Sequence, residues 1–472
     1  MSKTYRNAKE VLKRAREIYQ DDIHPFKTID INHRLKSGGN KGNLGQIVEE
    51  GWFNIDVNSR HEKDFPEANL ELKLIPYIKD RKEELKGKER LVVSMINYKE
   101  EAKISKFEDS SFWKKADQIL IMTYEHRYDK EKGDYYVDYA RIFRIPQNDL
   151  EIIKNDWQII HNYIVNGKAH ELSESLTNYL GACTKGSNSE NLVSQHDSDI
   201  KAMPRAYCLK SSYVNSLIKN SLFVDDEYPQ GELADSTLSV LDVNETSNLL
   251  EVKVNNALNQ YVGMDINTIV SNLGFHSKNK GINNLLINEI LRRFDLNLID
   301  ELTKSNTIIK TVVLDDKKKI NLKESMSFPS FRFLEIVNEE WDTSKQREYF
   351  EDLRILFIVF VRKNDEVKLY KHFFYTLGNF ELKEISNVYK RLRNILMAGH
   401  VFEFDHVRKI YKNRLPKAID NPVAHIRPHA SKADYNKNGK NADWIPSDNT
   451  WMTKQCFWLN SKYIKKIILS QI

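Results

Sequence analysis

Two stretches of this chain recur in the same order roughly 240 to 250 residues later, which predicts a tandem duplication. Residues 41–49 (KGNLGQIVE) match 280–288 (KGINNLLIN), and residues 205–213 (RAYCLKSSY) match 455–463 (QCFWLNSKY). The first pair keeps a loop Lys-Gly, and the second keeps the register of Leu, Ser and Tyr. Because 472 residues exceed one ordinary hydrophobic core, the repeat predicts two domains of the same architecture.

The boundary between the two copies is predicted by a change of composition. From Phe223 the sequence becomes acidic, with Pro229 and Gly231, and it stays rich in Asp, Ser and Thr up to about Asn248. Such a composition is typical of a linker rather than a core. We therefore expect an N-terminal domain at 1–222, a linker at 223–247 and a C-terminal domain at 248–472.

Composition limits the classes of partner and compartment. A net charge of +5 permits nucleic-acid binding but does not require it, so a local basic groove has to supply the attraction to phosphate. The three cysteines, Cys183, Cys208 and Cys456, fit neither a disulfide scaffold nor a zinc site. No apolar run approaches the ~20 residues that span a bilayer, and the N-terminus has no secretory pattern. We expect a soluble, reduced, cytoplasmic protein with no membrane partner.

One short segment of the first copy indicates chemistry. Residues 70–74 alternate as Leu-Glu-Leu-Lys-Leu, the period of a half-buried strand, so Glu71 and Lys73 should share a face. Asp64 lies seven residues before Glu71. Carboxylates are the oxygen ligands that Mg²⁺ prefers, and a nearby Lys can orient or deprotonate an attacking water. The pattern favours a metal-dependent phosphodiesterase; taken alone, it also fits a solvated face of an edge strand.

The neighbouring segments add to this pattern. A Gly-rich loop precedes an apolar-periodic segment in which Leu44, Ile47 and Val48 fall on one helical face, with Glu49 near its edge. Lys115 directly precedes the buried-strand pattern 119–122 (ILIM), so a second amine should reach the same place.

With these residues, the chain resembles the MutH-like endonucleases. This family includes the mismatch-repair nicking enzyme and the GATC-cutting type II restriction endonucleases of the Sau class. The family's landmarks occur here in the family's order, as Lys41, Gly42, Glu49, Asp64, Glu71, Lys73 and Lys115. Segments 178–186 and 205–211 resemble its two DNA-reading segments. The resemblance implies an α/β (α+β) fold of two tandem restriction-endonuclease-like domains, each a mixed central sheet flanked by helices.

The resemblance also implies roles for residues of the first copy. Asp64, Glu71 and the backbone carbonyl of Leu72 would ligate Mg²⁺, and Glu49 is a candidate for a further ligand. Lys73 and Lys115 would position the water and stabilise the charge of the transition state. The expected reaction is in-line hydrolysis that leaves a 5′-phosphate and a 3′-hydroxyl.

The residues expected to contact DNA lie in three segments. Lys41 and Gly42 would approach base edges from the first loop, although Lys41 equally fits a contact to phosphate alone, and Lys185 would read from a later loop. The last segment adds Arg205, Cys208 and Lys210. Mismatch-repair members carry a tyrosine at the position of Cys208, so the smaller side chain predicts cleavage whether or not the adenine is methylated. The alternative is that Cys208 is a packed core residue.

The second copy is expected to be catalytically silent. If Lys310 matches Lys73, Ile308 replaces Glu71 and Glu301 stands opposite Asp64; a separate match through the apolar run 355–358 puts Glu351 where Lys115 was. The carboxylate cluster for Mg²⁺ is then missing. DNA binding can remain, and its expected contacts are Lys280, Gly281, Arg427, His429 and Trp458. The alternative is a copy kept only for packing or dimerisation.

The function expected from these features is a type II restriction endonuclease that cuts both strands at 5′-GATC-3′ with Mg²⁺. The second copy would bind another GATC as an allosteric effector or looping arm, with a transient dimer on DNA as one outcome. A strand-nicking mismatch-repair enzyme is the first alternative, but that enzyme resembles only the first copy. A non-catalytic GATC-binding regulator is the second, and it has no reason to keep three carboxylates beside DNA.

Overall fold

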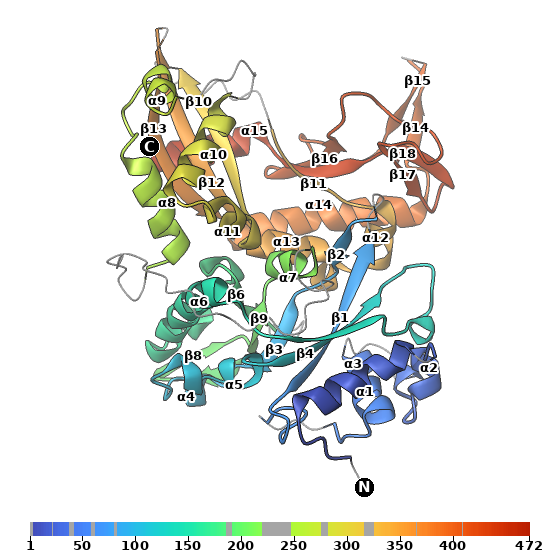
Figure 1. Cartoon of the computed structure of the whole chain (residues 1–472). Helices are drawn as coiled ribbons and strands as arrows, with labels where there is room; N and C mark the ends of the chain where they lie inside the picture. Colours follow the sequence, from blue (N-terminus) through green and yellow to red (C-terminus); the bar gives the residue numbers. More distant parts are fainter. Residues whose placement is uncertain are drawn as a thin grey trace. The chain divides into compact units, whose positions relative to one another are not determined.

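A computed structural model describes residues 3–20, 22–36, 42–57, 62–79, 83–185, 191–219, 247–274, 282–315, 325–364, 366–407 and 409–472. The chain divides into two compact units. Unit 1 comprises Met1–Lys253 with Asp300–Asn306, and unit 2 comprises Val254–Ile299 with Thr307–Ile472. The helices and strands of both units are labelled in Figure 1. Of the residues named above, Lys41, Lys280 and Gly281 lie outside the described residues, as does all of the expected linker except its last residue.

Unit 1 is built on a mixed four-stranded sheet with the order β2-β1-β4-β5. Its strands are β1 (Glu71–Lys79), β2 (Leu85–Gly87), β4 (Ile119–Glu125) and β5 (Tyr139–Phe143). Strands β1 and β4 run parallel, with Glu71 opposite Ile119, while β2 and β5 pair antiparallel at the two edges. The unbroken apolar run at the start of β4 is buried, as expected for a central strand.

A second, antiparallel sheet of unit 1 has the order β3-β9-β6. Its strands are β3 (Leu91–Met95), β6 (Leu180–Thr184) and β9 (Arg205–Leu209). A hairpin of β7 (Val193–Gln195) and β8 (Ser198–Ala202) separates β6 from β9 along the chain. The two segments expected to read DNA therefore lie on neighbouring strands of one sheet.

Helices cover these sheets. The apolar face of α1 (Ala8–Gln20) buries Val11, Ala15 and Ile18 in the same core as sheet residues such as Leu72 and Leu120. The other helices of unit 1 are α2 (Phe26–Ile29), α3 (Asn43–Ile47), α4 (Tyr98–Glu101), α5 (Trp113–Ala116), α6 (Gln147–Val165) and α7 (Ser211–Leu217). Among the described residues, no helix is both long enough and apolar enough to cross a membrane.

Unit 2 repeats the strand pairing of unit 1. Strands β10 (Thr307–Asp315) and β12 (Arg354–Lys363) run parallel, and β13 (Glu366–Thr376) pairs antiparallel with β12. A separate antiparallel sheet joins β11 (Met326–Ser330), β19 (Gln455–Leu459) and β16 (Ala424–Pro428), as β3-β9-β6 do in unit 1. A hairpin of β17 (Ala442–Ile445) and β18 (Thr450–Thr453) again lies between the last two strands in sequence. The mixed α/β architecture expected from the sequence is confirmed.

The helices of unit 2 also follow the order seen in unit 1 (Figure 1). They are α9 (Ile266–Asn272), α10 (Ile282–Phe294), α12 (Phe333–Asn338), α13 (Lys345–Asp352), α14 (Asn379–Ala398) and α15 (Ser461–Gln471), while α8 (Leu249–Asn259) and α11 (Leu298–Lys304) contribute to both units. Between α14 and β16, unit 2 has an additional hairpin of β14 (Phe402–Asp405) and β15 (Ile410–Asn413). The corresponding segment of unit 1, residues 166–179, contains no strand.

Candidate active site

The site begins at the first residue of β1. Glu71 is 1% exposed, and its backbone N–H donates to Gln118 O at 3.2 Å, which fixes the start of the strand beside β4. Lys73 Nζ lies 2.6 Å from Glu71 Oε1. The two side chains therefore share a face of β1, as the alternation in the sequence predicts.

A second ammonium reaches the same carboxylate from α5. Lys115 Nζ lies 3.1 Å from Glu71 Oε1. The N–H of Trp113, the first residue of α5, donates to Ser110 Oγ at 3.0 Å, and this short helix holds Lys115 next to the sheet. The other oxygen, Glu71 Oε2, is buried and has no hydrogen-bond partner among the described residues. Two cations thus share one oxygen of Glu71, and the second oxygen is left for another positive group.

Asp64 is held over the start of β1 by a turn. Its Oδ2 accepts from the backbone N–H of Leu72 at 2.8 Å. The turn is closed by a bridge between Phe65 and Leu70. Beside Asp64, the buried Lys63 donates to Asn69 O at 3.0 Å and pairs with Asp117, which ties the turn to the region between α5 and β4. Lys63 is a positioning residue, and no motif in the sequence points to it.

Glu49 comes from a π-helical turn, Val48–Trp52, that directly continues α3. A side chain at Gly51 would meet the backbone of α2, because a Cβ atom there would lie 1.8 Å from Ile29 O. Glu50, the neighbour of Glu49, pairs instead with Arg34 at 2.5 Å. Glu49 and Glu50 are adjacent in this wide turn, but Glu49 does not share the ion pair of Glu50 with Arg34. Turns of the π type are frequent at functional sites.

The carboxylates of this site influence one another electrostatically. Burial, followed by the nearby Asp64, raises the pKa of Glu49 to about 7. Burial, followed by the charge of Glu71, raises the pKa of Asp64 to about 6. Burial would lower the pKa of Lys73, but Glu71 and Asp64 outweigh it and raise that pKa overall. Lys73 is therefore a firmly protonated ammonium beside an excess of negative charge.

The donor set suits a hard divalent cation. Within the described residues, no three His, Cys, Asp or Glu side chains already converge as a metal-binding group. Two features nevertheless fit a cation: among the described residues Glu71 Oε2 is buried without a hydrogen-bond partner, and burial together with neighbouring carboxylates raises the pKa values of Glu49 and Asp64. Carboxylate oxygens with a backbone carbonyl are ligands that Mg²⁺ accepts.

The residues expected in the base-reading loops are only partly described. Gly42 is exposed and lies at the N-terminus of α3. Lys185 is half-buried and follows β6, where its backbone N–H donates to Pro204 O at 2.8 Å. Asp156 on α6 fixes the start of β6 by accepting from the N–H groups of Tyr179 and Leu180 at 2.6 and 3.0 Å. The buried Asp156 is a second positioning residue that the sequence analysis did not identify. The only feature of the sequence that could have indicated it is a carboxylate within an apolar helix.

Three residues expected to contact DNA are instead buried in unit 1. Arg205 donates to the backbone carbonyls of Ala182, at 2.6 Å, and Leu172. Lys210 is 0% exposed and donates to the carbonyls of Thr177, at 2.7 Å, and Glu174.

Cys208 is likewise in the interior. Its side chain is 1% exposed, and Sγ lies 3.6 Å from Gly181 O in a small cluster with Cys183 and Ala206. Arg205, Cys208 and Lys210 therefore support the sheet and do not meet a base in this conformation. The adenine-methylation argument built on Cys208 loses its premise, and the packed-core alternative describes this residue.

Among the described residues of unit 2, no comparable charge cluster occurs at the matching positions. With Ile355 opposite Ile308, as Ile119 is opposite Glu71, the sheet register puts Ile308 at the position of Glu71 and Lys310 at that of Lys73. Burial lowers the pKa of Lys310. Glu351, expected at the position of Lys115, pairs with Arg347 at 2.6 Å.

One expected equivalence between the copies is wrong. Glu301 lies on α11 and pairs with Lys253 at 2.8 Å within unit 1, whereas Asp64 lies in a turn. Glu301 and Asp64 each precede the matched position, Ile308 or Glu71, by seven residues, but this equal spacing does not give the same geometry.

The candidate DNA-binding residues of unit 2 form a cluster on β16 and β19. The guanidinium of Arg427 lies over the ring of Trp458, 4.1 Å from its centre, and Trp458 Nε1 donates to Arg427 O at 2.9 Å. His429 meets the same ring edge-on, with ring centres 5.3 Å apart. Arg427 and His429 are exposed, while Trp458 is buried. By register, Trp458 and Arg427 occupy the positions of Cys208 and Cys183 of unit 1.

Comparison with known proteins agrees with this geometry. The MutH family, described as DNA mismatch repair enzyme MutH, matches residues 53–156, which include Asp64, Glu71, Lys73 and Lys115. The type II restriction enzyme Sau3AI of Staphylococcus aureus is 32% identical, over 98% of this chain and 98% of that enzyme.

Mismatch-repair relatives match a smaller part of the chain. The DNA mismatch repair protein MutH of Actinobacillus pleuropneumoniae serotype 3 (strain JL03) is 24% identical over 41% of this chain and 84% of its own length. That of Shewanella sp. (strain MR-7) is 26% identical over 46% of this chain and 96% of its own length. The chain therefore belongs to the MutH/Sau-type restriction endonucleases, which are site-specific deoxyribonucleases.

Proposed function

We propose that this enzyme uses Mg²⁺ to cut both strands of DNA at 5′-GATC-3′, with the chemistry confined to unit 1. The observation that carries this proposal is the convergence of Lys73 and Lys115 on one oxygen of the buried Glu71, beside Asp64. Restriction endonucleases generally use divalent metal ions. A DNA substrate also fits the cytoplasmic location expected from the sequence.

The residues of unit 1 divide the work of hydrolysis. Glu71 and Asp64, with the carbonyl of Leu72, would hold the cation, and Glu49 would add a further or water-mediated contact. The bound cation would polarise the phosphate and favour hydroxide formation from a water. Lys73, held beside Glu71, would orient the water and stabilise negative charge. Lys115 would act in the same way from α5. Attack on phosphorus breaks the bond to the 3′ oxygen, which leaves a 5′-phosphate and a 3′-hydroxyl.

Base reading in unit 1 is proposed for the loop residues Lys41 and Gly42 and for Lys185. Gly42 lets the backbone at the start of α3 approach DNA closely, because it has no side chain. Lys185 is anchored through its backbone at the end of β6, so its side chain projects from a fixed point. A Lys can donate to the O6 and N7 of guanine, and GATC has one guanine in each strand.

Unit 2 is proposed to bind another copy of the site as an effector, in cis or through looping of the DNA. Its proposed contacts are Lys280, Gly281, Arg427 and His429, with Trp458 holding the guanidinium of Arg427. A planar guanidinium stacked on an indole is pre-oriented for a bidentate contact to guanine. Ile308 and Glu351, at the expected positions of Glu71 and Lys115, leave unit 2 without the charges that hydrolysis requires.

A supercoiled plasmid assay tests the whole proposal. The protein is incubated with plasmids that carry no, one or two GATC sites, in Mg²⁺ or in EDTA. We expect linear product only with GATC and Mg²⁺, and a faster rate with two sites. Nicked circles as the final product would support the strand-nicking alternative, and an intact plasmid with retained DNA binding would support the regulator.

A further inference from the structure

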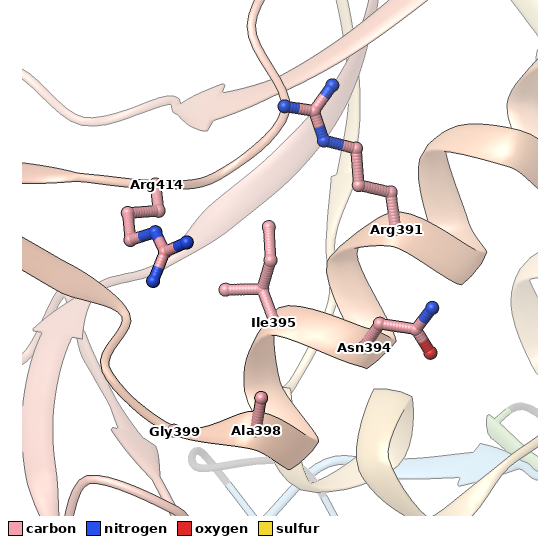
Figure 2. A pocket seen from close by; sticks show the side chains of 6 residues that line it. All are labelled: Arg391, Asn394, Ile395, Ala398, Gly399 and Arg414. Atoms are coloured by element: carbon pink, nitrogen blue, oxygen red, sulfur yellow. The ribbon is translucent and has the colours of Figure 1, made fainter.

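Unit 2 carries a basic cleft beside its additional hairpin. The hairpin β14–β15 and the segment after it face the C-terminal half of α14 and enclose a cleft of about 620 Å³. A smaller hollow of about 350 Å³ adjoins it along α14. Arg391 and Arg414 line both. Figure 2 shows that Arg391 rises from the helix and Arg414 from the opposite segment, with Ile395 between them.

The two arginines differ in how they are held. Arg391 Nη2 lies 3.5 Å from Asp420 Oδ2, and that oxygen also accepts from the backbone N–H of Lys417 at 2.8 Å. Asp420 thus contacts both Arg391 and the backbone N–H of Lys417, and this single contact leaves other N–H donors of Arg391 available. The exposed side chain of Arg414 has no hydrogen-bond or ion-pair partner among the described residues. Five N–H donors on each guanidinium make this an anion-binding arrangement.

The charge of the inserted segment supports that assignment. Residues 399–423, between α14 and β16, contain five Lys and Arg against three carboxylates, whereas the corresponding residues 166–179 of unit 1 contain one Lys against two Glu. The insertion therefore brings positive charge that the shared scaffold does not need for folding. Glu403 is the other carboxylate that lines the cleft with Asp420, and Lys412 and Lys417 line it with the arginines. A net positive cleft of this kind is complementary to a polyanion.

Aromatic and apolar side chains stand beside these cations. Phe404 and Tyr411 face each other across the hairpin with ring centres 5.1 Å apart, and they are 39% and 73% exposed. Val407, in the turn between the strands, is 92% exposed. Unit 2 does not bury this hairpin tip. Basic residues interleaved with exposed aromatic rings are typical of surfaces that contact nucleic acids.

The cleft adjoins the segment that follows Arg427. Phe402, at the base of the hairpin, lies with its ring centre 6.2 Å from that of Tyr435. Tyr435 belongs to the stretch between β16, which carries Arg427, and β17. The N–H of Val401 donates to Asp448 Oδ2 in the turn of the β17–β18 hairpin at 2.8 Å, which ties the insertion to the same region. The hairpin therefore extends the candidate DNA-binding surface of unit 2.

We propose that the cleft between α14 and β14–β15 binds the phosphodiester backbone of duplex DNA that flanks the base pairs contacted by Arg427. Arg391 and Arg414 contact phosphate oxygens, and the hairpin tip lies along the sugars. This inference rests on the proposed DNA binding of unit 2. It assigns to the insertion a contact that adds affinity without reading sequence, since phosphates are the same in every base pair.

The test measures DNA binding by the full chain carrying Asp64→Asn, so that no cutting occurs, on a duplex with two GATC sites. The double variant Arg391→Ala/Arg414→Ala is compared with Lys383→Ala/Lys466→Ala, which removes the same charge from exposed positions of unit 2. Over roughly 50 to 200 mM salt, each lost phosphate contact lowers the slope of log K against log salt by about 0.9. We expect a slope smaller by about 1.8 for the arginine pair and no change for the lysine pair.

Two further measurements identify the contact. Affinity for a duplex without GATC should fall by the same factor as affinity for GATC duplex, because phosphates carry no sequence. The Arg391→Lys/Arg414→Lys variant should keep the slope, since Lys also contacts phosphate as a point charge. An unchanged slope in the alanine pair would overturn the inference, and so would a loss confined to GATC duplex. If the alanine pair unfolds, the single change Arg414→Ala carries the test, with an expected slope decrease of about 0.9.

Arg427→Ala separates this inference from the proposed function. If Arg427→Ala weakens binding to the two-site duplex but the arginine pair does not, unit 2 binds DNA and only the role of the cleft fails. If neither weakens binding, DNA binding by unit 2 fails as well. If the Arg391→Ala/Arg414→Ala variant has a smaller salt slope but Arg427→Ala has no effect on binding, the cleft binds DNA and Arg427 does not.

Discussion

Lys73 Nζ lies 2.6 Å from Oε1 of Glu71, two residues earlier on the same face of β1. Oε2 of this carboxylate is buried and has no hydrogen-bond partner in the described part of the chain. Lys115 shares Oε1 at 3.1 Å. Glu71 thus receives two ammonium groups on one side and leaves its other oxygen for a cation. The different environments of its two oxygens distinguish Glu71 from a carboxylate in an ordinary surface ion pair. The corresponding position of unit 2 is occupied by Ile308, which has no carboxylate.

Removal of either ammonium should slow the chemical step more than it weakens binding. For Lys73→Ala and for Lys115→Ala we expect kcat to fall by about 100-fold or more, because each removes a donor to developing negative charge. DNA affinity should change by only a few fold. Lys114→Ala, at an exposed neighbouring position, is the control and should cut normally. Single-turnover cleavage and filter binding measure the two quantities. Equal losses in binding and rate would assign the lysines to DNA affinity instead.

Metal binding should weaken as pH falls. The pKa values of about 7 for Glu49 and about 6 for Asp64 mean that protons compete with Mg²⁺ for these carboxylates. Between pH 7.5 and 5.5 we expect the Mg²⁺ affinity to fall by on the order of 100-fold. Isothermal titration of the DNA-free enzyme at both pH values measures it. An affinity that does not depend on pH would remove these two carboxylates from the metal site.

The same carboxylates set the pH dependence of metal-free stability. Their pKa values in the folded protein lie above the usual 4.5 and 3.8, so the folded state binds protons more tightly than the unfolded chain. Their contribution to stability is therefore lost as pH rises from about 4 to about 7. Saturating Mg²⁺ should restore it at high pH, and thermal melts with and without Mg²⁺ show whether the gain in Tm grows with pH.

The cluster of Arg427 and Trp458 should control stimulation by a second site. Arg427→Ala removes the guanidinium, and Trp458→Phe removes the indole N–H that donates to Arg427 O. For both variants we expect the ratio of two-site to one-site cleavage rates to move towards one, more strongly for Arg427→Ala. Arg362→Ala, an exposed arginine of β12 in the same unit, serves as the control. An unchanged ratio in Arg427→Ala would contradict a role for this cluster.

Cys208 should affect stability but not the response to adenine methylation. It is buried beside Gly181 and Ala206, so Cys208→Ala should cost about 1 kcal/mol of unfolding free energy. Cys208→Tyr overfills this space and should cost about 1–3 kcal/mol. Digestion of methylated and unmethylated duplexes should give the same rate ratio for Cys208→Ala as for the parent enzyme. A changed ratio would return Cys208 to the base-reading surface.

The sequence predicted those parts of the site that depend on local periodicity. Glu71 and Lys73 had to share a face if residues 70–74 formed a strand, and Lys115 had to approach once the next strand was parallel. It misplaced Arg205 and Lys210, because a cation beside an apolar strand looks the same in sequence whether it faces DNA or backbone carbonyls. The carbonyls that accept their hydrogen bonds come from residues about 23 to 36 positions away. Such distant partners are not visible in a local pattern.

The comparison of the two copies shows the same limit. Strand register follows the apolar pattern, so Ile308 and Lys310 fall where the sequence match expects them. Glu301 does not, because equal spacing hides the difference between a helix and a turn. The β14–β15 hairpin also went unpredicted, since its strands have only four residues each.

Glu71→Gln tests the central claim, that unit 1 alone cuts DNA, most directly. The change keeps the size of the side chain and removes the charge that Lys73, Lys115 and the cation share. With Mg²⁺ and a two-site supercoiled plasmid, we expect neither linear nor nicked product, while binding to GATC duplex stays within a few fold of the parent enzyme. Glu67→Gln, an exposed residue of the Asp64 turn, should cut normally. Cleavage of either strand by Glu71→Gln would contradict the claim.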